Sequence, residues 1–390
     1  MVQIRLQNIG IFSMGDIKMV EKMLKVKNTD TVGTVNDLLK EFLKSNKVQA
    51  LLVMQEVPSK TMSFPVLISD HDKLNSNVFA PILPVSTATV ISKITKVKSA
   101  SKPIGVVMRS CQIRALVELF KLNQANIENI VIIGIDCLGT FPVNTYSDFP
   151  EKVTPTEYIL DSFKKKSDAV KYLRSACHTC KDPIPTNADI VIGLYGMDSQ
   201  KELLIQINSD KGKQLLEGFS LEELKDKKNR EKAIKEIREE KTKNRMEFIK
   251  NKSNIKGIDA LAKFFDKCIN CHNCMKICPI CYCRECLFES SVFDLELNKY
   301  IGKAEKKGLF KMPSDSLLFH TTRMNHMVVS CVGCGLCEQA CPSDIPLMEI
   351  IIPISESAQK EFDYNPGTNI EEKMPMVIYK EDEYQEVGEK

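Results

Sequence analysis

Short apolar runs recur through the first half of the chain and predict buried strands. They cover residues 48–54, 103–108, 130–136 and 189–194. Segments with apolar residues at helical spacing lie between them, for example at 35–43 and 112–122. Strands that alternate with helices are typical of an α/β fold around a mostly parallel sheet. We therefore predict an α/β (α+β) domain with flanking helices over residues 1–215.

The pattern changes over residues 216–255, where Lys, Arg and Glu are dense and apolar residues are few. This segment contains Ser220 and Glu223, whose spacing is that of a capping box at a helix start. We predict a charged helical linker here. Two roles stay open for it. A solvated helix is the commoner meaning of such a charge run, and a partner-binding face is the alternative.

Cysteine usage marks the next boundary, because eleven of the fifteen cysteines lie within residues 256–354. We expect this segment to be a separate, cysteine-rich domain. Residues 355–390 are acidic, and we expect an extended tail with a turn near residues 364–367. Such a tail could lie on a partner subunit.

Composition narrows the class of protein. The chain of 390 residues is 43% hydrophobic and 27% charged with a net charge of +3, which gives no support for nucleic-acid binding. No apolar run approaches the roughly 20 residues that span a bilayer, and the start of the chain lacks a signal-peptide pattern. We therefore expect a cytoplasmic protein without a membrane span. Cytoplasmic thiols stay reduced, so the many cysteines favour metal ligation over disulfides.

Two copies of one cysteine motif give the strongest signal. The first copy has Cys268, Cys271, Cys274 and Cys278 before Pro279, and the second has Cys331, Cys334, Cys337 and Cys341 before Pro342. Corresponding cysteines are 63 residues apart at every position. This is the spacing of bacterial two-cluster ferredoxins, in which three close thiolates hold one [4Fe-4S] cluster and the fourth reaches the other.

The repeat therefore predicts two [4Fe-4S] clusters with crossed ligation. Cluster 1 is assigned to Cys268, Cys271, Cys274 and Cys341, and cluster 2 to Cys331, Cys334, Cys337 and Cys278. Zinc is the alternative, but zinc sites typically pair CxxC units, and two full copies with trailing prolines favour iron–sulfur chemistry. The insertion between the copies is longer than in a compact ferredoxin, so the spacing between the clusters stays open.

The remaining cysteines fall into two groups. Cys111 and Cys137 follow predicted strands, while Cys177 and Cys180 form a CxxC pair. Ligands after parallel strands meet at the carboxyl edge of the sheet, so these four could hold a third cluster, although spacing alone does not decide it. The other group is Cys281, Cys283 and Cys286, and it has three open roles: substitute ligands, thiols near a partner's cluster, or buried small residues.

Histidines add weaker candidates. His178 and His272 lie between predicted ligands, where tuning a cluster, relaying a proton and having no role are all compatible with the pattern. We expect His320, Arg323 and His326, which precede the second motif, to pack internally or to face solvent. The pattern assigns no catalytic residue, and no hydrolase or phosphoryl-transfer motif is present.

Several strings together support a family resemblance. They are VVMRSCQIRALVELFKL, IIGIDCLGT and CHTCKDPIPTNADIVIGLYG. Their motifs resemble the beta-subunit family of F-420-reducing hydrogenase and F-420-dependent formate dehydrogenase. The C-terminal strings CPICYCREC and RMNHMVVSCVGCGLCEQACPSDIPL are similar to the formate dehydrogenase branch in particular.

The resemblance implies cofactors beyond the two clusters. It implies FAD in the α/β domain and a [4Fe-4S] cluster near the flavin, for which it favours Cys111, Cys137, Cys177 and Cys180. It also implies coenzyme F-420 as substrate. The elements that match the family's flavin-binding pattern contribute Gly33, Thr34, Asp189 and Gly193 as candidate FAD contacts. Gly33 and Thr34 are equally compatible with an ordinary helix cap.

Two functions follow as expectations. The first is an F-420-linked oxidoreductase beta subunit that moves electrons between clusters, FAD and F-420, with the catalytic alpha subunit of a formate dehydrogenase or hydrogenase as its partner. The alternative is a non-catalytic electron-transfer subunit without flavin that wires a dehydrogenase to heterodisulfide-reductase-type subunits. The single glycine at residues 31–35 and the missing lysine at 74–79 favour the alternative, whereas the A-D-I-x-x-G element at 188–193 favours catalysis.

Overall fold

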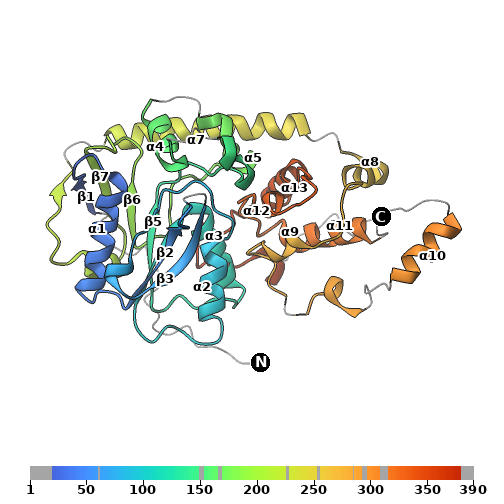
Figure 1. Ribbon diagram of the computed structural model, residues 1–390, viewed down its shortest axis with the longest axis horizontal. Coiled ribbons are helices and arrows are strands. Elements are labelled where there is room, and N and C mark those ends of the chain that lie inside the picture. The colour runs from blue at the N-terminus through green and yellow to red at the C-terminus, as the bar shows by residue number, and fades with distance from the viewer. Residues whose placement is uncertain are drawn as a thin grey trace.

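The computed structural model describes residues 20–59, 62–148, 153–165, 169–224, 228–252, 255–283, 285–291, 297–307 and 315–378. An eight-stranded sheet with the order β3-β2-β4-β5-β6-β7-β1-β8 dominates the first half (Figure 1). Its strands are β1 Val20–Lys25, β2 Ala50–Glu56, β3 Ser63–Ile68, β4 Ile104–Arg109, β5 Ile130–Ile135, β6 Ile190–Gly193, β7 Glu202–Ile207 and β8 Glu222–Glu223.

The centre of the sheet is parallel, which confirms the predicted α/β class. β2, β4, β5 and β6 pair in parallel, and β3 and β7 flank them antiparallel. The four predicted strands are the four central ones, since only these read as continuous apolar runs. The sequence prediction missed the outer strands, because β1 (VEKMLK) and β7 (ELLIQI) mix polar and apolar residues.

Helices cover both faces of the sheet. They are α1 Thr31–Lys44, α2 Thr87–Thr95, α3 Ser110–Lys121, α4 Pro155–Lys165, α5 Ser175–His178 and α6 Asp210–Leu216. Successive residues of β5 alternate between faces: Val131 and Ile133 pack with α1 and α6, whereas Ile130 and Ile132 pack with α2 and α3. The short 3-10 helices are His71–Lys73, Val143–Asp148, Ala169–Tyr172, Leu287–Glu289 and Pro375–Val377.

The charged segment forms one long helix, α7 (Lys228–Lys252), along the top of Figure 1. The predicted capping box at Ser220 and Glu223 is wrong. Glu223 belongs to β8, which pairs antiparallel with β1, and its carboxylate accepts a hydrogen bond from Lys22 at 3.1 Å. α7 is also not fully solvated, because Arg230, Lys241 and Arg245 are buried against the rest of the chain.

The cysteine-rich segment consists of short helices and loops. The helices are α8 Gly257–Phe264, α9 Asn273–Lys276, α10 Leu297–Lys307, α11 Ser316–Met327, α12 Leu336–Gln339 and α13 Met348–Glu361. α9 and α12 stand 63 residues apart, as the cysteines do, and they pack against each other. Among the described residues, no helix has the length and apolar character needed to cross a membrane.

The acidic tail differs from its expected extended form where it is described. Residues 355–361 continue α13, so the domain boundary placed at 354 falls inside a helix. The predicted turn is hydrogen-bonded to α3. The Tyr364 hydroxyl and the Gly367 amide donate to the same carboxylate oxygen of Glu118, at 2.6 and 2.8 Å. Residues 379–390 lie outside the described part of the chain.

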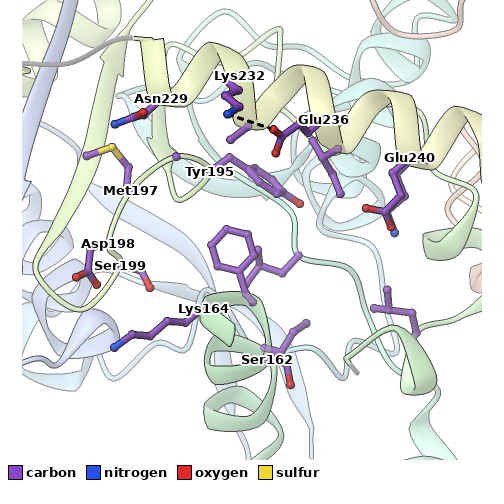
Figure 2. A pocket seen from close by; sticks show the side chains of 18 residues that line it. Ser162, Lys164, Tyr195, Met197, Asp198, Ser199, Asn229, Lys232, Glu236 and Glu240 are labelled. Atoms are coloured by element: carbon purple, nitrogen blue, oxygen red, sulfur yellow. Dashed lines mark ion pairs between the residues drawn. The ribbon is translucent and has the colours of Figure 1, made fainter. Parts of the chain in front are cut away.

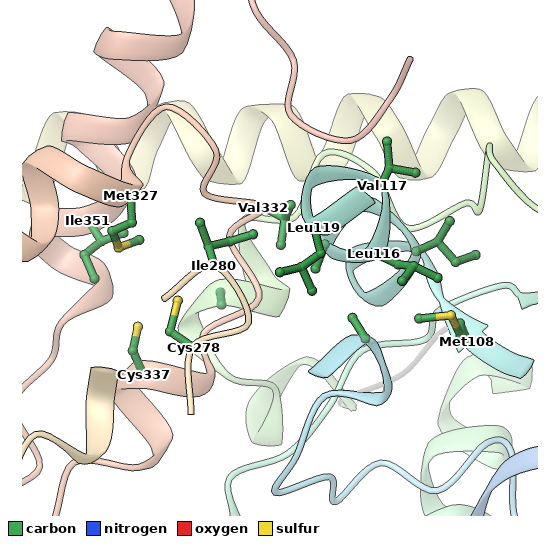
Figure 3. Close-up of a cluster of buried hydrophobic side chains, with 14 of the residues drawn as sticks. Met108, Leu116, Val117, Leu119, Cys278, Ile280, Met327, Val332, Cys337 and Ile351 are labelled. Atoms are coloured by element: carbon green, nitrogen blue, oxygen red, sulfur yellow. The ribbon is translucent and has the colours of Figure 1, made fainter. Parts of the chain in front are cut away.

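One hydrophobic core joins the two halves of the molecule. Leu116 and Leu119 of α3 belong to the same buried cluster as Ile280, Met327 and Ile351 of the cysteine-rich segment (Figure 3). Each such side chain contributes about 1.5–3 kcal/mol when fully buried. The cysteine-rich segment is therefore held against α3 and the sheet rather than tethered by α7 alone.

A buried ion pair fixes α7 to the carboxyl edge of the sheet. Asp136, which follows β5, pairs with Arg230 through both carboxylate oxygens at 2.7 and 3.1 Å. Both side chains are at most 3% exposed. Asp136 also accepts the amide hydrogens of Leu194 and Tyr195 after β6. One carboxylate thus holds three segments together.

We predict that Asp136→Asn destabilises the protein by about 3–5 kcal/mol, because it leaves the Arg230 cation buried without a counter-charge. The measurement is the free energy of unfolding in denaturant under anaerobic conditions. Asp161→Asn is the matched control, since Asp161 and Lys165 form an exposed pair worth below about 1 kcal/mol. Equal small losses in both variants would contradict the role given to Asp136.

Candidate iron–sulfur and cofactor sites

The two cysteine motifs share an unusual backbone geometry. Asn270 and His272 in the first copy have φ of 55° and 58°, and Gly333 and Gly335 at the same places in the second copy have φ of 67° and 72°. Left-handed backbone at two alternate positions curls each loop around a centre, and glycine adopts it at the least cost. The amide of Asn270 also donates to Cys268 Sγ at 3.4 Å.

The structure brings together the four cysteines assigned to cluster 1. They line one cavity, which also contains His272 and His320: Cys268, Cys271, Cys274 and Cys341. Cys341 comes from the second motif and lines this cavity together with the three cysteines of the first motif. Cys271 is exposed, whereas Cys268 and Cys274 are buried.

Cys278 crosses in the opposite direction, toward the second motif. Burial, together with the nearby Cys278, raises the pKa of the Cys331 thiol. For Cys337, burial and the nearby Cys278 raise the pKa of the thiol while Arg323 lowers it, and the net result is a pKa of about 12. The pKa of Cys334 is likewise raised by burial, by Cys111 and by Cys278. Cys278 thus lies close enough to Cys331, Cys334 and Cys337 to act on each of their thiols electrostatically.

The third group of cysteines gathers at the carboxyl edge of the parallel strands. One cavity is lined by all four thiols: Cys111 in the first turn of α3, Cys137 after β5, Cys177 in α5, and Cys180. Burial and the neighbouring Cys137 raise the pKa of Cys180 to about 12. Arg109, Arg174 and Lys241 line the same cavity, so basic side chains surround the four thiols.

The spacing of the sulfur atoms fits a cluster better than a single ion. Zinc lies about 2.3 Å from each thiolate, so the sulfurs of a zinc site stand within about 4.6 Å of one another. Among the described residues, three or more ligand atoms come within 4.8 Å of one another only at Asp70, His71 and Asp72, which include no cysteine. The cluster 1 cysteines and the third group each line one cavity without three of their sulfurs coming that close, which fits a four-iron core better than one zinc ion.

The third cysteine group and the cluster 2 group are neighbours. Cys334 of the second motif lines the cavity of the third group. Gly335 lies so close to Ala176 of α5 that an added Cβ would come within 2.5 Å of its Cβ. The Ser175 hydroxyl of α5 donates to Glu338 of α12, which ties the two loops together.

A large cavity of about 790 Å³ lies next to the cavity of the third cysteine group. α7 forms its roof, and α4 and the loop between β6 and β7 form its other walls (Figure 2). Ionisable side chains of both signs reach it: Lys164, Lys232, Lys241, Asp198, Glu236 and Glu240. Phe163 and Tyr195 add an aromatic wall, with their rings 5.2 Å apart.

The large cavity and the third cysteine group share a wall. Leu138 and Lys241 line both spaces. The Tyr195 hydroxyl donates to the Cys137 carbonyl at 2.9 Å, and Lys241 Nζ donates to the Cys177 carbonyl at 3.1 Å. A group bound in the large cavity therefore lies one residue layer from the four thiols.

The four residues expected to contact FAD do not line this cavity. The Gly33 amide donates to Asp30 at 2.8 Å, and Thr34 bonds the backbone of Lys27 and Asp30, so both serve the cap of α1. Asp189 accepts the Ile132 amide at 2.7 Å. Gly193 packs against the Arg230 guanidinium. Each residue thus has a structural partner.

Of the residues expected to pack internally or to face solvent, His320 and Arg323 pack internally, and they lie among the cysteines. His320 Nε2 is 3.2 Å from Cys268 Sγ, and its ring stacks on Phe265. Burial and the Arg323 cation lower the pKa of His320 to about 3, so the imidazole is neutral. Arg323 is buried between the two motifs. No local sequence signal distinguishes them from His326, which is exposed.

The remaining candidates separate by exposure. Cys281 is hydrogen-bonded to Cys278 and lies near Arg323, so it borders cluster 2. Cys286 Sγ contacts Met275 Sδ at 3.6 Å, and Cys283 is exposed. His272 stacks on Phe319 at the edge of cluster 1, with ring centroids 4.4 Å apart. These three cysteines therefore do not form a site of their own.

Paired cysteine motifs beside a cofactor-sized cavity define an iron–sulfur electron-transfer protein. Comparison with known proteins agrees. Residues 101–232 match the family described as the C terminus of the coenzyme F-420 hydrogenase/dehydrogenase beta subunit, and residues 264–345 match the 4Fe-4S dicluster domain. The chain therefore carries a domain of the F-420-linked hydrogenase and dehydrogenase beta-subunit family, followed by a 4Fe-4S dicluster domain, an arrangement found in oxidoreductase subunits.

Curated relatives match over most of the chain. The F-420-dependent formate dehydrogenase subunit beta of Methanocaldococcus jannaschii is 27% identical over 88% of this chain and 94% of its own length. The F-420-dependent formate dehydrogenase 1 subunit beta of Methanococcus maripaludis is 28% identical over 87% and 91%. A chain of the F-420-reducing [NiFe] hydrogenase complex from Methanosarcina barkeri aligns at a TM-score of 0.46 with 15% identity, over 62% of this chain and 94% of that one.

Crossed ligation predicts which double variants lose iron together. Cys341→Ala should remove about four irons per chain, and adding Cys268→Ala should remove no more, because both residues belong to cluster 1. Combining Cys341→Ala with Cys331→Ala should instead remove about eight. Iron content of anaerobically purified protein is the measurement, with the exposed Cys283→Ala as the control. A loss of only four irons in the Cys331 and Cys341 double variant would rule out the crossed arrangement.

Proposed function

We propose that this chain is the beta subunit of an F-420-linked formate dehydrogenase or hydrogenase and carries electrons between a catalytic partner subunit and FAD. In this proposal, FAD occupies the 790 Å³ cavity, a third [4Fe-4S] cluster is held by Cys111, Cys137, Cys177 and Cys180, and the two ferredoxin-type clusters are held as assigned. The observation that carries the proposal is the unbroken series of neighbouring sites from the cavity to the surface.

The series rests on specific contacts. Leu138 and Lys241 separate the cavity from the third cysteine group, and Cys334 joins that group to the cluster 2 cysteines. Arg323 lies between the cluster 2 and cluster 1 cysteines. When bound, a flavin exchanges two electrons with F-420 and single electrons with iron–sulfur clusters. Because these side chains hold the sites in a fixed order, electrons pass between the sites along one path.

The cavity suits a flavin nucleotide by size and by charge. Lys164, Lys232 and Lys241 supply cations for a pyrophosphate. The aromatic wall of Phe163 and Tyr195 offers a surface for a planar ring. Gly196 lets the β6–β7 loop approach α7 closely, since a Cβ there would come within 2.5 Å of the Arg230 backbone. The cavity lies at the carboxyl edge of the sheet, where α/β folds bind ligands.

The outer end of the series is where we place the catalytic partner. Cys271 is exposed, and the neighbouring Ile269 is 54% exposed. Leu287, which precedes the buried Phe288 beside His272, is 59% exposed. A subunit that hands electrons to cluster 1 needs a surface of this kind close to its ligands. The catalytic alpha subunit of a formate dehydrogenase or hydrogenase fits this place.

One observation favours the alternative function, an electron-transfer subunit without flavin that serves heterodisulfide-reductase-type subunits. The turn at the start of α1 resembles the family's glycine turn. In this turn the Gly33 amide and the Thr34 hydroxyl both donate hydrogen bonds to Asp30 and cap the helix. A phosphate cannot bind an amide that is already paired. Flavin content therefore separates the two functions.

We predict about one FAD and about twelve irons per chain in anaerobically purified protein, which corresponds to a flavin and three cubanes. The measurements are the flavin absorbance of the heat-released supernatant and a colorimetric iron assay. Protein with about eight or twelve irons and no flavin, even after incubation with FAD, would favour the alternative function.

A second prediction tests the cavity itself. Ala233→Trp should abolish flavin binding, because the indole fills the cavity beneath α7, while the iron content stays unchanged. Lys235→Trp is the matched control, since Lys235 lies on the exposed side of the same helix. Flavin retained in Ala233→Trp at the level of the control would show that FAD binds elsewhere.

A further inference from the structure

The insertion between the two cysteine motifs delivers a helix into the cluster domain. The buried side of α11 is formed by Phe319, His320, Arg323, Met324 and Met327. Their spacing follows one face of a helix, so the face packs as a unit. Met327 belongs to the same buried cluster as Cys278 and Cys337 (Figure 3). Arg323 is the one permanent cation on this face.

Arg323 lies between cysteines of both clusters. The side chains that act electrostatically on its guanidinium are Cys337, Cys278, Cys274 and Cys281. Cys274 is assigned to cluster 1, whereas Cys278 and Cys337 are assigned to cluster 2. The residue is only 4% exposed, so water does not screen these interactions.

Two hydrogen-bond donors of the Arg323 guanidinium are unpaired among the described residues. Nε and Nη2 of Arg323 are buried, and within the described part of the chain neither has a hydrogen-bond partner. No carboxylate of the described residues forms an ion pair with it either. A buried cation is stable only with negative charge close to it, and a buried donor left unpaired is unfavourable. An anion with acceptor atoms at this place would satisfy both conditions.

We propose that Arg323 is a positioning residue that pairs with both ferredoxin-type clusters and raises the reduction potential of each. Four thiolates around a four-iron core supply negative charge beside the guanidinium and sulfur acceptors for Nε and Nη2. Reduction adds one electron and no proton to that assembly, so the reduced form is more negative. A fixed cation stabilises the more negative form, and the potential rises. The inference rests on the proposed placement of clusters 1 and 2.

The test is a redox titration of the complete chain, followed by electron paramagnetic resonance, after anaerobic purification. Arg323→Gln and Arg323→Met remove the charge, and Arg323→Lys keeps it. We expect both midpoint potentials to shift downward in the two neutral variants and to stay near the unmodified value in Arg323→Lys. Arg238→Gln is the matched control, because Arg238 is exposed on α7. It should leave both potentials unchanged.

Each outcome bears on the proposal. Neutral variants that keep their iron and their potentials would overturn it. If both neutral variants lose iron while Arg323→Lys retains it, the clusters need the charge, and the pairing is supported. Loss of iron in all three would assign Arg323 a packing role and overturn the proposal. The unmodified chain distinguishes a failure of this inference from a failure of the proposed function. If the unmodified chain lacks the signals of the two ferredoxin-type [4Fe-4S] clusters, the placement of those clusters is wrong.

Discussion

The buried pair of Asp136 and Arg230 is the contact on which both cofactor regions depend. Asp136 directly precedes Cys137, so its position fixes a thiol of the third group. It also holds the amides of Leu194 and Tyr195, which begin the loop that walls the large cavity. Arg230 carries the start of α7, the roof of that cavity. Because both charges are out of water, the pair tolerates little displacement.

Rigidity extends from this pair to the cysteine-rich segment. Arg245 of α7 pairs with Glu356 of α13 at 2.6 Å, and the turn after α13 returns to Glu118 of α3. The shared hydrophobic core lies between these polar contacts. Electron transfer depends on short, constant separations between sites. A segment clamped at both of its flanks keeps those separations, which a flexible linker would not.

The sequence predicted what depends on local spacing. The crossing of Cys278 and Cys341 follows from a repeat, and Cys111 and Cys137 meet because parallel strands end at one edge. It did not settle what depends on packing: the sequence leaves open whether Arg323 packs internally or faces solvent, and only the docking of α11 shows that it is buried. At Gly33 the sequence leaves a helix cap and a cofactor contact open, and in the structure Asp30, three residues earlier, accepts the Gly33 amide and caps α1.

Charge balance links the clusters to folding. Around the third cysteine group, Arg109, Arg174 and Lys241 converge on one cavity, and Arg323 does the same between the two motifs. Burial raises the pKa of Cys111 and of Cys337, so these two thiols favour the neutral form. A metal that binds such thiols displaces their protons and leaves anionic sulfur beside the cations. In the proposed function, cluster insertion and the charge balance of the buried cations are therefore coupled.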